Sequence, residues 1–143
     1  MEETLIKRVM PNSLEAEQSV IGSMIMDQDA IVTAMEILLQ EDFYHKQYGM
    51  LFDAMIELYS SGQPVDLVTL QNKLKEKDVP QEVSSLEFVG ELVRAVPTSA
   101  NVKYYCNIVK ENSMKRKLIR VTEEIENECY LSLIHISEPT RLD

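Results

Sequence analysis

The sequence has no tryptophan, only four glycines and five prolines among 143 residues, and only 6% aromatic residues. So little glycine and proline, without a low-complexity tract, is the composition of a folded globular chain rather than a disordered one. Few aromatics together with frequent methionine, leucine and glutamate favour helices over sheets. The two cysteines, Cys106 and Cys129, lack CxxC spacing, which indicates reduced thiols in the cytoplasm.

Long hydrophobic runs and clustered glycines are also absent. The most apolar stretches, such as residues 20–26 and 30–39, are well below the roughly 20 residues needed to span a bilayer, and the acidic start MEET has no apolar signal core. The glycines stand alone at positions 22, 49, 62 and 90, whereas a phosphate-binding loop needs them close together before a helix. We therefore expect no membrane segment and no nucleotide site.

Positive charge is scarce, since the net charge is −10 and the isoelectric point is near 4.7. A phosphate backbone would be repelled over most of such a surface, so direct DNA binding is not expected. The one basic cluster contains Lys115, Arg116, Lys117 and Arg120, and a run of glutamates follows it. The cluster is typical of a solvated helix face; its alternative role is the recognition helix of a helix-turn-helix DNA-binding module.

What the sequence does contain is hydrophobic residues at helical spacing. With 45% hydrophobic residues the chain can build one core, and we find no alternation long enough for a sheet. Capping residues, apolar periodicity, glycine and proline predict helices over residues 12–26, 27–38, 48–59, 66–79, 84–96 and 99–128. The predicted caps include Asn12 or Ser13 for the first helix, Asp66, and Ser84, the last in a capping box with Glu87. The predicted fold class is an all-α compact bundle of five to six helices.

The inward faces of these helices follow from the same spacing. The residues predicted to be buried are Leu14, Ile21, Met24, Ile25, Ile31, Ala34, Met35, Leu38, Tyr48, Leu51, Phe52, Met55, Tyr59, Leu67, Leu70, Leu74, Leu86, Val89, Val93 and Val96. Gly22 is expected to permit close approach of a neighbouring element.

The last predicted helix is long because residues 99–128 contain neither glycine nor proline. Its first half has core candidates in Tyr104, Tyr105, Ile108 and Val109. Its second half has a separate narrow stripe of Leu118, Val121, Ile125 and Cys129. A stripe beyond the globular body requires a partner helix.

Candidates for catalysis are few. His45 is the one plausible general base, and the acidic pairs Glu15–Glu17 and Glu41–Asp42 fit helix starts and turns better than acid/base chemistry. His45, Cys106 and Cys129 lack metal-ligand spacing. We predict no catalytic, cofactor-binding or metal residues, and hence no enzyme activity in this chain alone. The methionines fit core packing better than a pliable docking surface.

Four stretches together resemble the N-terminal domain of DnaB-type replicative helicases: PNSLEAEQSVIGSMI at 11–25, EDFY at 41–44, GQPVDLVTL at 62–70 and VPTSANVKYYCNIVKE at 96–111. The resemblance runs in order over about 120 residues. Ser84 and Ser85 depart from it, because many relatives have a glycine pair there.

This resemblance implies a helical bundle followed by a helical hairpin, six copies of which form a collar on an ATPase ring and dock primase. The long helix would be the first arm of an incomplete hairpin, with Leu118, Val121, Ile125, Lys115 and Arg116 as candidate interface residues toward the second arm, a neighbouring subunit or primase. ATP and Mg²⁺ would bind only in a C-terminal RecA-like ATPase domain, which no part of this sequence matches. A helicase loader is a further possible partner.

The segment LSLIHISEPTR at 131–141 resembles the translation of a sequencing-library adapter. We therefore expect a flexible arm at 1–11, an incomplete helicase domain at 12–130 and an adapter-derived tail at 131–143. Two alternatives remain open beside the helicase domain and the DNA-binding module: a stand-alone helical interaction adaptor, and a small acidic carrier protein, although the carriers' Asp-Ser-Leu attachment pattern is absent.

Overall fold

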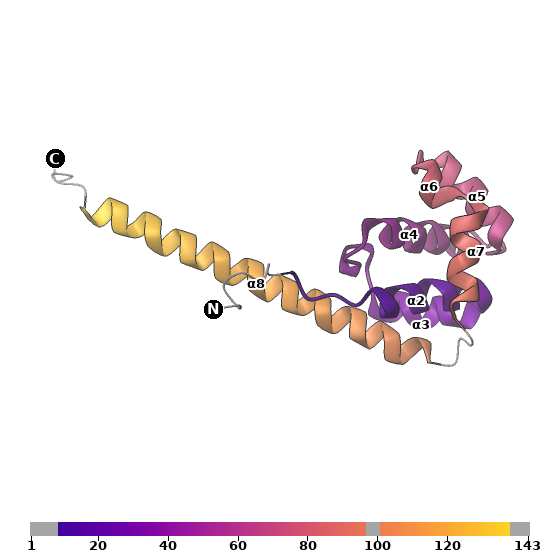
Figure 1. Cartoon of the computed structure of the whole chain (residues 1–143), viewed down its shortest axis with the longest axis horizontal. Helices are drawn as coiled ribbons and strands as arrows, with labels where there is room; N and C mark the ends of the chain where they lie inside the picture. Colours follow the sequence, from indigo (N-terminus) through magenta and orange to yellow (C-terminus); the bar gives the residue numbers. More distant parts are fainter. Residues whose placement is uncertain (1–8, 97–100, 138–143) are drawn as a thin grey trace. The chain divides into compact units, whose positions relative to one another are not determined.

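The computed structural model describes residues 9–96 and 101–137, with side chains to residue 134. All regular structure in these residues is helical. The elements are α2 (Leu14–Met26), α3 (Gln28–Ile37), the 3-10 helix η1 (Gln40–Asp42), α4 (Lys46–Ser60), α5 (Leu67–Glu76), α6 (Gln81–Ser84), α7 (Leu86–Arg94) and α8 (Val102–Ser137) (Figure 1). The predicted all-α fold with a long last helix is confirmed.

The chain divides into two compact units, which are described separately below. The larger unit is Asn12–Ser113 and includes the first part of α8. The smaller unit is Met1–Pro11 together with Met114–Asp143. The predicted flexible arm at 1–11 lies largely outside the described residues, because only residues 9–11 of it are described.

Side-chain caps begin four of the described helices in the larger unit, α2, α3, α5 and α7. The Ser13 hydroxyl accepts the N–H of Ala16 at 3.1 Å at the start of α2, and the Asp27 side chain caps α3. Asp66 Oδ1 accepts the N–H of Thr69 at 2.9 Å, and the Thr69 hydroxyl accepts the N–H of Asp66 at 2.9 Å. Such reciprocal bonds satisfy amide groups that have no partner within the helix. The predicted caps at Ser13 and Asp66 are confirmed.

The predicted cap at Ser84 is wrong. Ser84 is the last residue of α6 and is buried, while Ser85 caps α7 by accepting the N–H of Phe88 at 3.1 Å. The cause lies upstream: α5 ends at Glu76, and Pro80 then begins a further short helix instead of only ending the previous one. Because Ser84 is the last residue of α6, the N-cap of α7 is the next residue, Ser85.

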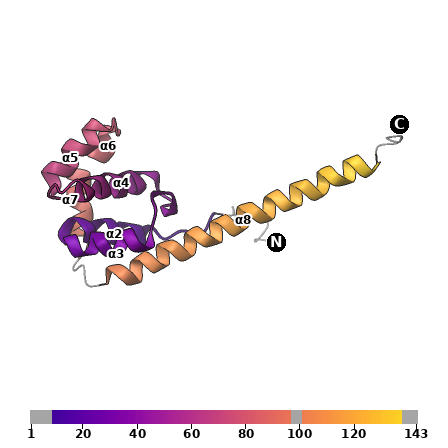
Figure 2. The same ribbon diagram turned by 180° about the vertical axis from the view of Figure 1, so that it is seen from behind.

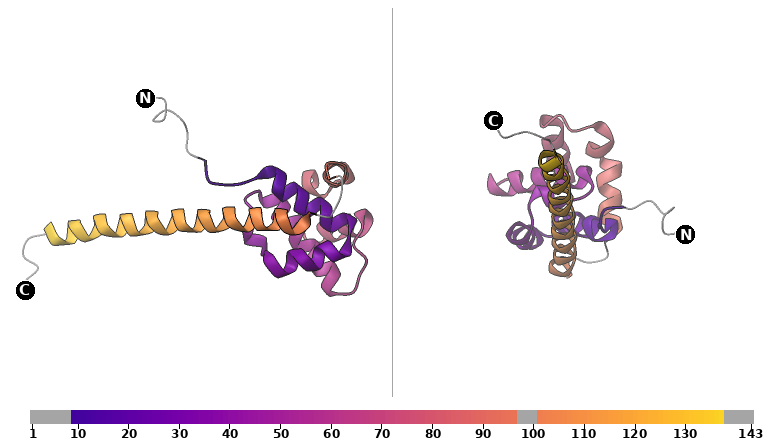
Figure 3. Two further views of the ribbon diagram at one scale, coloured as in Figure 1. Left: turned by 90° about the horizontal axis from the view of Figure 1, so that it is seen from below. Right: turned by 90° about the vertical axis from the view of Figure 1, so that its left-hand side faces the viewer.

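The core of the larger unit forms around α2, which packs against α3, α4 and α7, while α4 also packs against α5 (Figures 1 and 2). The largest fully buried hydrophobic side chains are Val20, Ile21, Met24, Ile31, Leu51, Met55, Leu58, Leu70, Leu74, Val89 and Val109. The turned views place α2 and α3 beside one another as well (Figure 3). One continuous core therefore joins helices that are far apart in the sequence.

Four residues predicted to be buried are exposed: Leu14, Met35, Leu86 and Tyr104. Three of them lie in the first turn of their helices, where fewer neighbours surround a side chain. Val20, Leu92 and Cys106 are buried in the core although spacing alone did not select them. These helices have apolar residues on more than one face, so the spacing of apolar residues alone does not define which face is buried.

The predicted role of Gly22 is confirmed. A Cβ atom at this position would lie 2.5 Å from Val96 Cγ2 and 2.8 Å from the carbonyl oxygen of Leu92, closer than packed atoms can approach. Gly22 thus allows α2 to contact the end of α7 through its backbone.

Gly62 follows α4 with a φ of 75°, a left-handed conformation that glycine adopts without strain.

Replacing Phe52 with alanine should lower the free energy of unfolding by about 3–5 kcal/mol, because Phe52 is only 4% exposed and its truncation leaves a cavity. Thermal and denaturant unfolding would measure the loss. Val68→Ala is the matched control, since Val68 is 61% exposed, and should change stability by less than about 0.5 kcal/mol. Equal melting temperatures for wild type and Phe52→Ala would contradict this packing.

Candidate protein-interaction site

The first part of α8 belongs to the core of the larger unit. Val102, Cys106 and Val109 are buried there, at spacings of four and three residues. Burial raises the pKa of the Cys106 thiol to about 12, because the thiolate would be poorly solvated. Cys106 is therefore a neutral packing residue at physiological pH rather than a nucleophile.

A buried carboxylate holds this part of α8. Asp42, at the end of η1, is fully buried and accepts hydrogen bonds from the Ser113 hydroxyl at 2.6 Å, the Leu39 N–H at 2.8 Å and the Lys110 ammonium at 3.1 Å. Burial alone would raise the pKa of Asp42, but these three donors outweigh burial and hold the pKa below its usual value. The charged form is thus the stable one, and it links η1 to α8.

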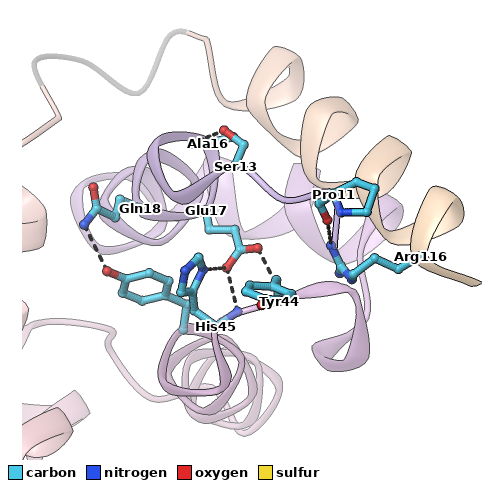
Figure 4. A network of polar contacts seen from close by, with 9 residues as sticks. Pro11, Ser13, Ala16, Glu17, Gln18, Tyr44, His45 and Arg116 are labelled. Atoms are coloured by element: carbon cyan, nitrogen blue, oxygen red, sulfur yellow. Dashed lines mark hydrogen bonds and ion pairs between the residues drawn. The ribbon is translucent and has the colours of Figure 1, made fainter. Parts of the chain in front are cut away.

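A second buried carboxylate links α2 to the start of α4 (Figure 4). Glu17 is 1% exposed; its Oε2 accepts the N–H of Tyr44 at 2.9 Å, and its Oε1 accepts the N–H of His45 at 3.1 Å. The Nδ1 of His45 lies 2.9 Å from the same Oε1. Beside this contact, Gln18 donates a hydrogen bond to the Tyr48 hydroxyl at 2.9 Å.

The candidate base His45 is thus engaged structurally. Its Nδ1 lies within hydrogen-bond distance of Glu17 Oε1. His45 is also the residue that precedes α4, and its own N–H points at the same carboxylate. The arrangement fixes the position of the first turn of α4 against α2. Of the pairs considered from the sequence, Glu17 and Asp42 are buried structural anchors, while Glu15 and Glu41 are exposed.

The smaller unit contains the second part of α8, where the candidate interface residues lie. Leu118, Val121 and Ile125 are 64%, 47% and 55% exposed and are separated by three and four residues, so they share one face of the helix. We call these three residues the α8 stripe. Cys129 and Lys115 are exposed as well. Exposed apolar side chains in a row mark a surface suited to binding another protein.

Arg116 departs from its neighbours. It is 3% exposed and donates from Nη1 to the carbonyl oxygen of Pro11 at 2.8 Å (Figure 4). The basic cluster is therefore not solvated throughout, because Arg116 joins α8 to the chain segment before α2. An open groove beside it is lined by Val9, Met10, Pro11, Ile119, Thr122, Glu123 and Glu126.

The long helix extends beyond its predicted end at Glu128 and reaches Ser137. The segment that resembles an adapter translation contains no proline or glycine before Pro139, so nothing in it interrupts a helix. The predicted start at Ser99 lies outside the described residues, and the helix is described from Val102.

In the described part of the chain, no three His, Cys, Asp or Glu side chains group in a way that could hold a metal ion. Among the same residues, no helix is both long enough and apolar enough to cross a membrane.

Replacing Asp42 with asparagine should lower the free energy of unfolding at neutral pH by about 2–4 kcal/mol, because hydrogen bonds to a buried charge are lost or weakened. Because the pKa of Asp42 is lowered in the folded state, its contribution is present above the unfolded value of 3.8 and is lost as pH falls through the lower folded pKa. The difference between wild type and Asp42→Asn should thus shrink below about pH 4. Urea unfolding across pH would measure it; Glu41→Gln, at an exposed neighbour, should show no such trend.

Replacing Glu17 with glutamine should destabilise the larger unit by about 2–4 kcal/mol, because the amide can accept the N–H groups of Tyr44 and His45 only weakly and brings an N–H₂ donor into a buried site. Glu15→Gln lies in the same first turn of α2 but is exposed, and should cost only a few tenths of a kcal/mol through the helix dipole. Chemical unfolding compares the two variants. Equal stabilities would refute the anchoring role of Glu17.

Comparison with known proteins agrees with this architecture. Residues 9–111 match the family described as DnaB-like helicase N terminal domain. The chain is 42% identical over 130 residues to the replicative DNA helicase DnaB of Geobacillus stearothermophilus and 37% identical over 130 residues to the replicative DNA helicase DnaC of Bacillus subtilis. These alignments cover 91% of this chain but only 29% of either relative.

Two solved structures are similar. The N-terminal domain of DnaB helicase from Mycobacterium tuberculosis aligns with a TM-score of 0.84 at 33% identity, covering 87% of this chain and 89% of that one. The corresponding Helicobacter pylori domain, whose structure was described with its interactions with primase, has a TM-score of 0.71 at 22% identity, covers 81% and 90% of the two chains, and supports the fold alone. The chain belongs to the DnaB-like helicase N-terminal domain family.

Proposed function

We propose that this chain is the collar and primase-docking domain of a replicative DNA helicase subunit. Its role is to assemble subunits into a hexamer and to receive primase, and possible further contacts include a helicase loader. Unwinding would depend on ATP and Mg²⁺ bound in a C-terminal domain. Family membership and the alignment to 29% of the length of two replicative helicases support this proposal.

The α8 stripe is the observation that carries the binding role. Fully burying a leucine- or isoleucine-sized side chain is worth about 1.5–3 kcal/mol, so three such residues on one face give a partner helix a sizeable driving force. We propose that the second arm of a helical hairpin and a neighbouring subunit cover this face. Exposed Lys115, three residues before Leu118, would set the orientation of a partner rather than supply most of the affinity. Arg116 would contribute to this interface indirectly, by holding Pro11 against α8.

The charge of the chain supports a protein-binding role over a DNA-binding one. A net charge of −10 opposes contact with phosphates, and one member of the basic cluster, Arg116, is already bound to the Pro11 carbonyl. We therefore place DNA contacts elsewhere in the full-length subunit, take residues 12–130 as the domain, and place its work in the cytoplasm.

The 143-residue chain alone should be monomeric or weakly dimeric, because one helix face with no covering arm buries too little surface for a stable assembly. Multi-angle light scattering over a concentration series would measure the mass. A stable hexamer of this chain would contradict the expectation, since it would show that the collar assembles without the second arm.

The decisive experiment replaces Leu118 and Ile125 together with aspartate in the full-length helicase. Hexamer stability and primase affinity should each fall by about tenfold or more, because charges enter an apolar interface. Both residues are already exposed, so the fold should survive, as circular dichroism can check. Val68→Asp, at an exposed apolar position on α5, is the control. Unchanged assembly and primase binding in the double variant would refute the proposal.

A further inference from the structure

The larger unit has its own exposed apolar face, separate from the α8 stripe. On α3, Val32 and Met35 are 37% and 38% exposed, and Leu39 just beyond the helix is 55% exposed. Val32 and Met35 are three residues apart and share one side of α3. Leu39 lies in the extended segment after the helix and lines the same hollow as Met35. The core side of α3 is occupied by other residues, namely Ala30, Ile31, Ala34 and Leu38. The helix therefore has a second apolar face that the fold does not use.

This face continues onto α4. Met35 and Leu39 line an open hollow of about 200 Å³ together with Phe52, Asp53 and Ile56. Phe52 closes its floor, because that side chain is 4% exposed and belongs to the core. We call the surface formed by these residues and Val32 the α3–α4 face. Its shape is a shallow groove with an apolar base between two helices, of the kind that receives an amphipathic helix.

The border of the α3–α4 face is negatively charged. Asp53 and Glu57 are one turn apart on α4 and share the single ammonium of Lys77, which lies 2.9 Å from Asp53 and also bonds Glu57. Two carboxylates and one ammonium leave one net negative charge. Glu36, exposed beside Met35 on α3, adds another. A cationic ligand would thus meet attraction on both helices, whereas an acidic helix or a phosphate surface would be repelled.

We propose that the α3–α4 face binds an amphipathic helix of a partner protein whose apolar side enters the hollow and whose lysines or arginines face Glu36, Asp53 and Glu57. The exposed anchors for its apolar side are Val32 and Met35 on α3 and Leu39 in the extended segment that follows. The charge complementarity selects a basic helix over other apolar ligands. This binding site does not depend on the function proposed for α8.

The test uses the 143-residue chain and a fluorescently labelled synthetic helix built only of leucine and lysine, with the leucines on one side. Fluorescence anisotropy should show saturable binding that weakens as the NaCl concentration rises. Met35→Asp should weaken binding about tenfold or more, and Glu36→Lys, which leaves every apolar contact intact, should weaken it as well. The matched control Val68→Asp should bind like wild type.

Amide chemical shifts locate the bound peptide. Shifts concentrated on α3 and α4 support the proposal, whereas shifts confined to α8, with binding lost in Ile125→Asp and kept in Met35→Asp, overturn it. A second peptide with glutamate in place of lysine should fail to bind, and equal binding of both peptides would show simple apolar adhesion instead. Absence of any binding would also overturn the proposal.

Discussion

The carboxylate of Glu17 is enclosed within the larger unit. Its two oxygens accept hydrogen bonds from the backbone N–H groups of Tyr44 and His45, and Nδ1 of the His45 ring lies 2.9 Å from Oε1. Burial removes this side chain from water, so its hydrogen bonds from the backbone N–H groups of Tyr44 and His45 must replace its hydration. The contact spans α2 and the residues that precede α4. It thereby fixes the direction in which α4 enters the core, and the packing of Leu51 and Met55 follows from that direction.

Asp42 likewise joins two elements of the larger unit through a buried carboxylate. Its three donors connect the 3-10 helix to the first part of α8, so the last helix is joined to the core by a charged bond as well as by Cys106 and Val109. Buried ion pairs contribute little net stability compared with apolar packing, but removing one partner is costly. Both carboxylates therefore specify a single arrangement of helices and are not expected to do chemistry.

Two groups of exposed apolar residues, the α8 stripe and the α3–α4 face, have different chemistry. The α8 stripe begins within the basic cluster and continues among glutamates, whereas the α3–α4 face is bordered by acidic residues and one shared lysine. A helical domain without a catalytic cluster can act on a partner through such surfaces, since each selects ligands by shape and charge.

The sequence by itself determined the helical class, most helix starts, the close approach at Gly22 and the exposed stripe on the last helix, because capping, spacing and glycine conformation are local properties. It also supported the family through four ordered stretches. Only the tertiary structure decided that Glu17, Asp42 and Arg116 are buried and bound, that Ser85 rather than its neighbour caps α7, and that α3 has a second apolar face. The partners of Glu17 and Arg116 and two of the three donors to Asp42 lie far away along the chain, and no local pattern indicates which distant groups folding will bring to them. The cap at Ser85 follows instead from the short helix α6, which ends one residue before it.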